Sequence, residues 1–267
     1  MRRVVISIHM PFLRARKPAV AGYFYPSDKK RLEEYVDRLM GEKVEVEGNL
    51  RGLIVPHAGY ECSGIVAGKV YALLKNRSYK RVVLVGPSHF VDFNGYSFGS
   101  FHAFETPLGR VEVDHLVLKG FPEEAFWDMP HLYEHSLEVQ LPFLQRSLRD
   151  FLLVPVVYGR VEAKKLKELL DTLCDENTLF VISSDLSHYY ADETARRIDA
   201  YCHRWILEGK EELKKECEAC GKIGIEGALL YAKEKGLKAK LVDYKTSAET
   251  CGDDRRVVGY GGHVFTS

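Results

Sequence analysis

Three short apolar runs in this chain each end in a histidine. They span residues 52–57, 82–89 and 179–188 and end in His57, His89 and His188. Runs rich in Val, Ile and Leu and bounded by Gly, Pro or Ser are typical of strands that are buried on both faces of a sheet. In an open α/β sheet, ligands bind beyond the carboxyl ends of the strands. The three imidazoles are therefore predicted to meet at one edge of the sheet, where they could form a metal or catalytic site.

The rest of the chain alternates predicted helices with predicted strands. Amphipathic spacing predicts helices over residues 28–40, 63–74, 136–148, 163–173, 194–207 and 227–235. Further strands are predicted over 152–157, 241–244 and 257–265, and a Pro/Gly turn predicts a hairpin over 96–113, which makes the sheet mixed. The pattern indicates α/β class: a single three-layer α/β/α domain over residues 16–267. Residues 1–15 are interpreted as an N-terminal extension, disordered or forming an early edge strand.

Composition excludes several classes of partner. The 267 residues include 38 Lys and Arg against 38 Asp and Glu, so no net charge favours nucleic acid or an anionic membrane. No apolar run is long enough to span a bilayer. We therefore expect a small-molecule or peptide ligand of unknown identity, with no nucleic acid and no membrane.

Six scattered cysteines favour a reducing compartment, the cytoplasm, over a disulfide framework. Cys62, Cys174 and Cys202 are predicted to be buried thiols. Cys217 and Cys220 form a lone CxxC pair, and because a structural zinc site needs four ligands, neither a zinc site nor a redox pair is favoured there.

Asp185 lies three residues before His188 in the segment that ends the third apolar run. A carboxylate can orient an imidazole and raise its basicity, in a metal site or in general-base catalysis. The alternative is that Asp185 caps the following helix and His188 only packs in the core.

Five separated motifs resemble the Memo family, in the same order along the chain. They are residues 16–26, the segments ending in His57 and His89, residues 134–142, and residues 183–188. The resemblance covers roughly residues 16–264. It implies a LigB-like fold, related to the class III extradiol dioxygenases, in which a non-haem Fe(II) lies at this end of the sheet.

The resemblance also implies roles for individual residues. His57 and His89 would be metal ligands, and His188 would be an acid/base residue with Asp185 beside it. Cys251 would be the third ligand, with Glu249 or Asp253 as substitutes. A pocket would be lined by Tyr60, Ser88, His135 and Glu138.

The expected cofactor is Fe(II), although zinc or copper could also bind. A thiolate in place of the carboxylate of the usual two-His, one-carboxylate triad leaves two functions open. The chain could be a metal-dependent, dioxygenase-like oxidoreductase. It could instead be a non-enzymatic metal- or peptide-binding interaction protein that retains the cleft.

A rival motif spans residues 131–135, where His131, Glu134 and His135 spell H-x-x-E-H, the signature of inverted zinc proteases. On one helix the two histidines would share a face and bind zinc. Pro130 directly precedes the motif and would place it in the first turn of a helix, which argues against that interpretation.

Overall fold

Four parallel strands form the centre of the main sheet in the computed structural model, which describes residues 14–267. They are β2 (Leu50–Val55), β8 (Thr178–Ser183), β3 (Arg81–Pro87) and β7 (Leu152–Tyr158), in that order across the sheet. Nearly every residue in them is buried, as their apolar sequences predict. The three strands that precede the predicted histidines are therefore neighbours at the centre of the sheet.

Antiparallel strands extend this sheet on both sides, so it is mixed, as predicted. On one side β11 (Val257–Thr266) pairs with β2, and β10 (Lys238–Thr246) pairs with β11. On the other side β4 (Tyr96–Ser97) pairs with β7. The short strand β9 (His188–Tyr190) pairs with the start of β11 and so holds His188 beside the sheet.

The predicted hairpin forms, but in a second sheet. Strands β5 (Ala103–Thr106) and β6 (Gly109–Glu112) pair across the Pro/Gly turn, and β1 (Ala15–Arg16) adds to β5. The end of the predicted extension thus contributes to an edge strand, while residues 1–13 lie outside the described part of the chain.

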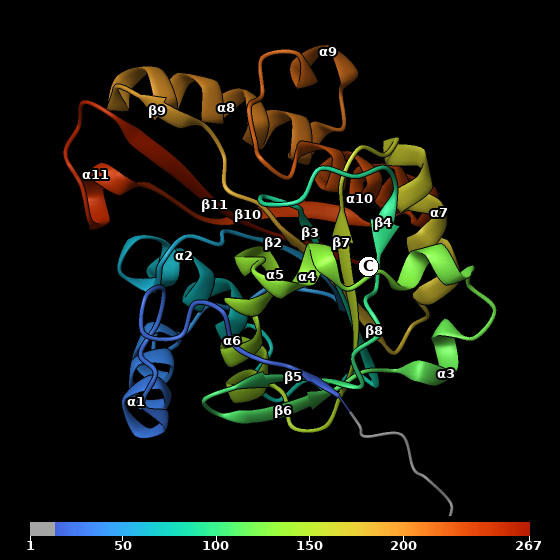
Figure 1. Cartoon of the computed structure of the whole chain (residues 1–267). Helices are drawn as coiled ribbons and strands as arrows, with labels where there is room; N and C mark the ends of the chain where they lie inside the picture. The colour runs from blue at the N-terminus through green and yellow to red at the C-terminus, as the bar shows by residue number, and fades with distance from the viewer. Residues whose placement is uncertain (1–13) are drawn as a thin grey trace, which may run out of the picture.

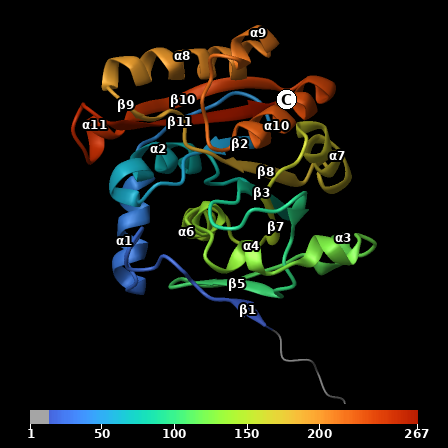
Figure 2. The ribbon, with the colours of Figure 1, turned by 45° about the horizontal axis from the view of Figure 1, so that its top comes forward.

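Helices cover both faces of the main sheet, which gives the expected three layers (Figure 1). One face carries α2 (Tyr60–Ala72), α5 (His135–Glu138) and α6 (Leu141–Ser147), with α1 (Lys29–Leu39) packed outside them. The other carries α7 (Ala163–Leu173), α10 (Lys222–Lys235) and α8 (Asp192–Glu208). Figure 2 shows α8 and α2 on opposite sides of β10 and β11.

The remaining helices are single turns in the connections: α3 (His115–Leu118), η1 (Glu123–Phe126), α4 (Met129–Leu132), α9 (Glu211–Lys214) and α11 (Ser247–Thr250). The helix predicted over residues 136–148 is divided into α5 and α6, because Pro142 starts a new helix in its first turn. Among the described residues, no helix has the length and apolarity needed to cross a membrane.

Two disulfides contradict the prediction that the cysteines are reduced. Cys62 in α2 is bonded to Cys251 after α11, and Cys202 in α8 is bonded to Cys217. The free thiols are Cys174 and Cys220. The first pair is separated by 189 residues, so the sequence alone gave no sign that its two sulfur atoms meet.

Candidate metal centre

His57 is fixed by groups that follow the neighbouring strand β8. Its backbone N–H donates to Oδ1 of Asp185 at 2.8 Å, and its ring Nδ1 lies 2.9 Å from the hydroxyl of Ser183. Burial, followed by the charge of His89, lowers the pKa of His57 to about 3. The ring is therefore neutral at physiological pH, which is the form that binds metals.

His89 follows β3, and its ring centroid is 5.0 Å from that of His57. Glu134 holds it through two hydrogen bonds, from the His89 backbone N–H to Oε1 at 2.5 Å and between the ring Nδ1 and Oε2 at 2.9 Å. Burial opposes a charge on His89, but the hydrogen bond and charge of Glu134 outweigh it and raise the pKa. With Nδ1 bonded to a carboxylate, Nε2 is left as the donor atom for a metal.

Burial also opposes ionisation of Glu134, but the hydrogen bond and charge of His89, together with the backbone N–H groups of Ser136 and His89, outweigh it and lower the pKa of Glu134 to about 2. The same carboxylate accepts a hydrogen bond from the backbone N–H of Ser136 at 2.9 Å and so caps α5. Glu134 therefore stays ionised and joins the helix to the imidazole. Glu134 was not predicted as a site residue, although it lies in the motif of residues 134–142 and in the rival H-x-x-E-H motif.

Cys220 supplies the sulfur atom of the site. Its Sγ lies 3.3 Å from Nε2 of His57, and donor atoms of His57, His89 and Cys220 all lie within 4.8 Å of one another. Burial raises the pKa of the Cys220 thiol to about 12. Two imidazole nitrogens and one sulfur fit a transition metal such as zinc, copper or iron, which would bind the sulfur as a thiolate.

Cys251 does not take the role that the resemblance implied. Its sulfur is bonded to Cys62, so it cannot act as a free thiolate ligand, and the prediction is wrong on this structure. The substitutes are engaged elsewhere: Glu249 pairs with Arg196, and Asp253 pairs with Arg255. In the sequence, Cys220 stands out only as the second cysteine of the CxxC pair. The fold is needed to show that this cysteine faces His57.

His135, predicted to line the pocket, brings a third imidazole to the centre. Its ring centroid is 4.5 Å from that of His89 and 5.4 Å from that of His57. Its Nδ1 is buried, 3.7 Å from Oε2 of Glu134, and has no hydrogen-bond partner among residues 14–267. Burial, followed by the charge of His57, lowers the pKa of His135 to about 4. His89, Glu134 and His135 form a second group that could hold a cation.

Asp185 and His188 lie at the same end of the sheet. Oδ2 of Asp185 is 3.8 Å from Nε2 of His57, and burial raises the pKa of this carboxyl group. His188 begins β9 at this edge of the sheet, and its charge contributes to lowering the pKa of both His57 and Asp185. Asp185 does not cap the following helix, because α8 begins at Asp192 with Ala191 as its cap.

The other predicted pocket residues have different surroundings. Ser88, with His89 and Cys220, lines a cavity of about 360 Å³ that also borders Phe90 and Arg160. Tyr60 instead lies in the core, where its hydroxyl donates to the carbonyl of Val139.

Glu138 is a buried structural anchor. It pairs with the buried guanidinium of Arg16 and accepts hydrogen bonds from the backbone N–H groups of Ala19 and Val20 and from the Tyr25 hydroxyl. It thereby fastens the segment that precedes α1 to α5. Because Glu138 is buried among these partners, its carboxylate stabilises the fold, although it belongs to the motif of residues 134–142 that was predicted to line the pocket.

The rival protease motif is not assembled. His131 belongs to α4, whereas His135 begins α5, so the two rings do not share a helix face. His131 is buried, and its Nε2 lies 2.8 Å from the carbonyl oxygen of Ser97.

Comparisons with known proteins identify the family to which this chain is similar. The family described as "Memo-like protein" matches residues 16–264. A "MEMO1 family protein" of Aquifex aeolicus is 39% identical, over 95% of this chain and 100% of the relative. Another, of Archaeoglobus fulgidus, is 37% identical, over 94% of this chain and 99% of the relative. Among solved structures, the uncharacterized protein JW3007 of Escherichia coli K12 aligns with a TM-score of 0.47 and 13% identity, covering 82% of this chain and 100% of that one.

Proposed function

This chain belongs to the Memo family, and we propose that it binds one transition-metal ion between His57, His89 and Cys220. The observation that carries the proposal is the approach of three donor atoms within 4.8 Å from three separate connections of the chain. Two imidazole nitrogens and one sulfur that converge in this way are donor types that transition metals bind in proteins. The unpartnered Nδ1 of His135 beside the cluster supports the same conclusion.

We propose Fe(II) as the native metal, as the resemblance implies, with zinc and copper as competitors. A thiolate among the donors is compatible with all three, because soft sulfur ligands also suit zinc and copper. Geometry and metal supply, more than raw affinity, decide which ion a site of this type contains.

We further propose that the centre is the active site of a metal-dependent oxidoreductase. A bound iron ion would supply the redox chemistry of such a reaction. Glu134 would keep the His89 ring in one orientation, and the cavity beside His89 and Cys220 would admit a small ligand. Asp185 and His188 would hold and move a proton at the edge of the cluster. The position of His188 three residues after Asp185 at this edge of the sheet, and the raised pKa of Asp185, support this role.

The donor set favours a second candidate function. In the two-His, one-carboxylate triad of iron oxygenases the third ligand is an oxygen, whereas here the nearest third donor is the sulfur of Cys220. That difference favours a metal-binding protein without catalysis, which uses the same cleft to bind a small molecule or peptide.

Oxygen uptake separates the two functions. The protein is loaded with Fe(II) without oxygen, mixed with a catechol, and exposed to oxygen in an electrode cell. Uptake in excess of the loaded iron, lost in His188→Gln, is expected for the enzyme. Retained iron with no catechol-dependent uptake would overturn the oxidoreductase proposal and favour the binding protein.

A further inference from the structure

We propose that a second cavity, between the connection after β3 and η1, binds organic ammonium ions. This cavity has a volume of about 720 Å³, and its wall includes Phe93, Phe126, Trp127, Glu123 and Glu124. None of these residues belongs to the metal centre. The proposed metal site therefore does not account for this cavity.

Aromatic rings form one part of the wall. The rings of Phe93 and Trp127 meet edge to face, with centroids 5.8 Å apart. Trp127 is 45% exposed, although folding normally buries most of so large an apolar side chain. The negative face of an aromatic ring attracts a cation, most strongly when the ring is tryptophan. An exposed tryptophan in a hollow surface is thus a contact for an alkylated cation.

Carboxylates form another part of the wall. Glu123 and Glu124 begin η1, and both are exposed. Within the described chain, neither makes an ion pair with Lys, Arg or His. Two arginines contact the wall, Arg14 through Ser100 and Arg160 through Asn94. Each is already paired with an aspartate, Arg14 with Asp128 and Arg160 with Asp92. Within residues 14–267, the carboxylates of Glu123 and Glu124 therefore present negative charge to the cavity without an ion-pair partner.

Charge and shape together identify the class of ligand. A small inorganic cation holds its hydration water tightly and would gain less from the aromatic rings, and a neutral apolar molecule would leave both carboxylates without a partner. A ligand with alkyl groups around a positive nitrogen uses both features, because its methyl groups contact the rings and its charge is offset by Glu123 or Glu124. We therefore assign the cavity to small alkylammonium compounds.

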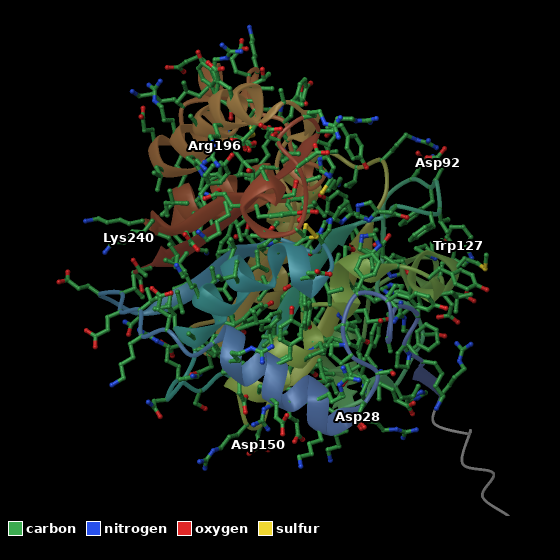
Figure 3. All side chains as sticks on the ribbon, turned by 90° about the vertical axis from the view of Figure 1, so that its left-hand side faces the viewer. Asp28, Asp92, Trp127, Asp150, Arg196 and Lys240 are labelled. Carbon is green, nitrogen blue, oxygen red and sulfur yellow. A yellow bond between two sulfur atoms is a disulfide. The ribbon has the colours of Figure 1, made fainter. Side chains whose placement is uncertain are left out.

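The second cavity adjoins the metal-site cavity along one connection. Residues 87–92 line the cavity beside His89, and the next two residues, Phe93 and Asn94, line the aromatic one. Figure 3 shows Asp92 and Trp127 at the same side of the molecule. An ammonium ligand would thus bind on the face from which the metal centre is reached.

Tryptophan fluorescence tests the proposal directly, because the chain has only two tryptophans. Trp205 is 1% exposed, so a small solute that alters emission acts on Trp127. The full chain is titrated with choline at constant ionic strength, and in parallel with 3,3-dimethylbutan-1-ol, a neutral molecule of the same shape. We expect a saturable change with choline and a response at least about tenfold weaker with the alcohol.

Two double variants complete the test. E123Q/E124Q is expected to weaken choline binding about tenfold or more, as measured by calorimetry. The matched control E212Q/E216Q removes two exposed carboxylates elsewhere and should leave binding unchanged. Equal responses to choline and the alcohol, no saturable response to choline, or unchanged binding in E123Q/E124Q would each overturn the proposal. Circular dichroism verifies that both variants are folded.

Discussion

The Sγ atom of Cys220 lies 3.3 Å from Nε2 of His57, although the two residues are 163 positions apart in the sequence. The connection after β2 carries the imidazole, and the turn before α10 carries the thiol. Because both connections end at the same edge of the sheet, the fold makes a nitrogen–sulfur donor pair from residues that no local motif links. This contact distinguishes Cys220 from Cys251 as the third ligand.

Replacement of Cys220 should weaken metal binding strongly. We expect Cys220→Ser to lower affinity for zinc or Fe(II) by more than about a hundredfold, because loss of a direct ligand exceeds the 10- to 100-fold effect of an indirect one. Competition with a chromophoric chelator measures the change. Cys174→Ser, which removes the other free thiol, is the control and should bind metal as the unaltered protein does. Equal affinity of both variants would rule out Cys220 as a ligand.

Replacement of Glu134 should have a smaller effect on the same measurement. Glu134→Gln keeps the size of the side chain but removes the charge that holds the His89 ring. We expect metal affinity to fall about 10- to 100-fold, the usual effect of losing a carboxylate behind a ligating histidine. An affinity within twofold of the unaltered protein would show that Glu134 does not support His89 as a ligand.

Glu138→Gln should act on stability and not on the metal. The carboxylate and its partner Arg16 are both buried, and loss of one partner leaves a buried charge unpaired. Breaking such a pair costs about 3–5 kcal/mol of unfolding free energy. Urea denaturation measures the loss, and metal stoichiometry below the transition should remain that of the unaltered protein. A stable variant with altered metal content would instead place Glu138 in the ligand site.

Stability should fall in mild acid because histidines outside the metal centre are buried in the neutral form. Burial lowers the pKa of His131 and of His203 to about 4, and lowers that of His263 well below its usual value. In the unfolded chain these groups titrate near 6.5. These histidines therefore make their full contribution to the free energy of unfolding above about pH 6.5, and that contribution declines as the pH falls towards 4.

Each such histidine takes up a proton on unfolding in this range. Each should therefore lower the unfolding free energy by about 1.4 kcal/mol for every unit by which the pH falls. Urea melts of the metal-free protein at pH 7.5, 6 and 5 measure the slope. His131→Gln, whose amide can still donate to the Ser97 carbonyl, should reduce the slope by about one proton. A slope that is identical in this variant would contradict the assignment.

The sequence allowed the sheet, and the placement of two candidate ligands at its edge, to be predicted, since both follow from local patterns. His57 and His89 come directly after apolar runs, and parallel strands place such residues at a common edge. The layers follow from the alternation of strands and helices. These features depend on short stretches of chain, which a sequence displays directly.

The partners of the cysteines could not be predicted in this way. Whether Cys251 meets a metal or Cys62 depends on how α11 lies against α2, which no local pattern specifies. Likewise, the turn before α10 decides that Cys220 faces His57 while Cys217 faces Cys202. Long-range side-chain contacts of this kind depend on how the helices and turns pack against one another, and a local sequence pattern does not specify that packing.

X-ray absorption spectroscopy of the protein loaded with zinc without oxygen tests the central claim most directly. We predict one sulfur at about 2.3 Å and two nitrogens at about 2.0 Å from the metal. The sulfur signal should be lost in Cys220→Ser and kept in the double variant C62S/C251S. A sulfur signal that persists in Cys220→Ser but is lost in C62S/C251S would contradict the account.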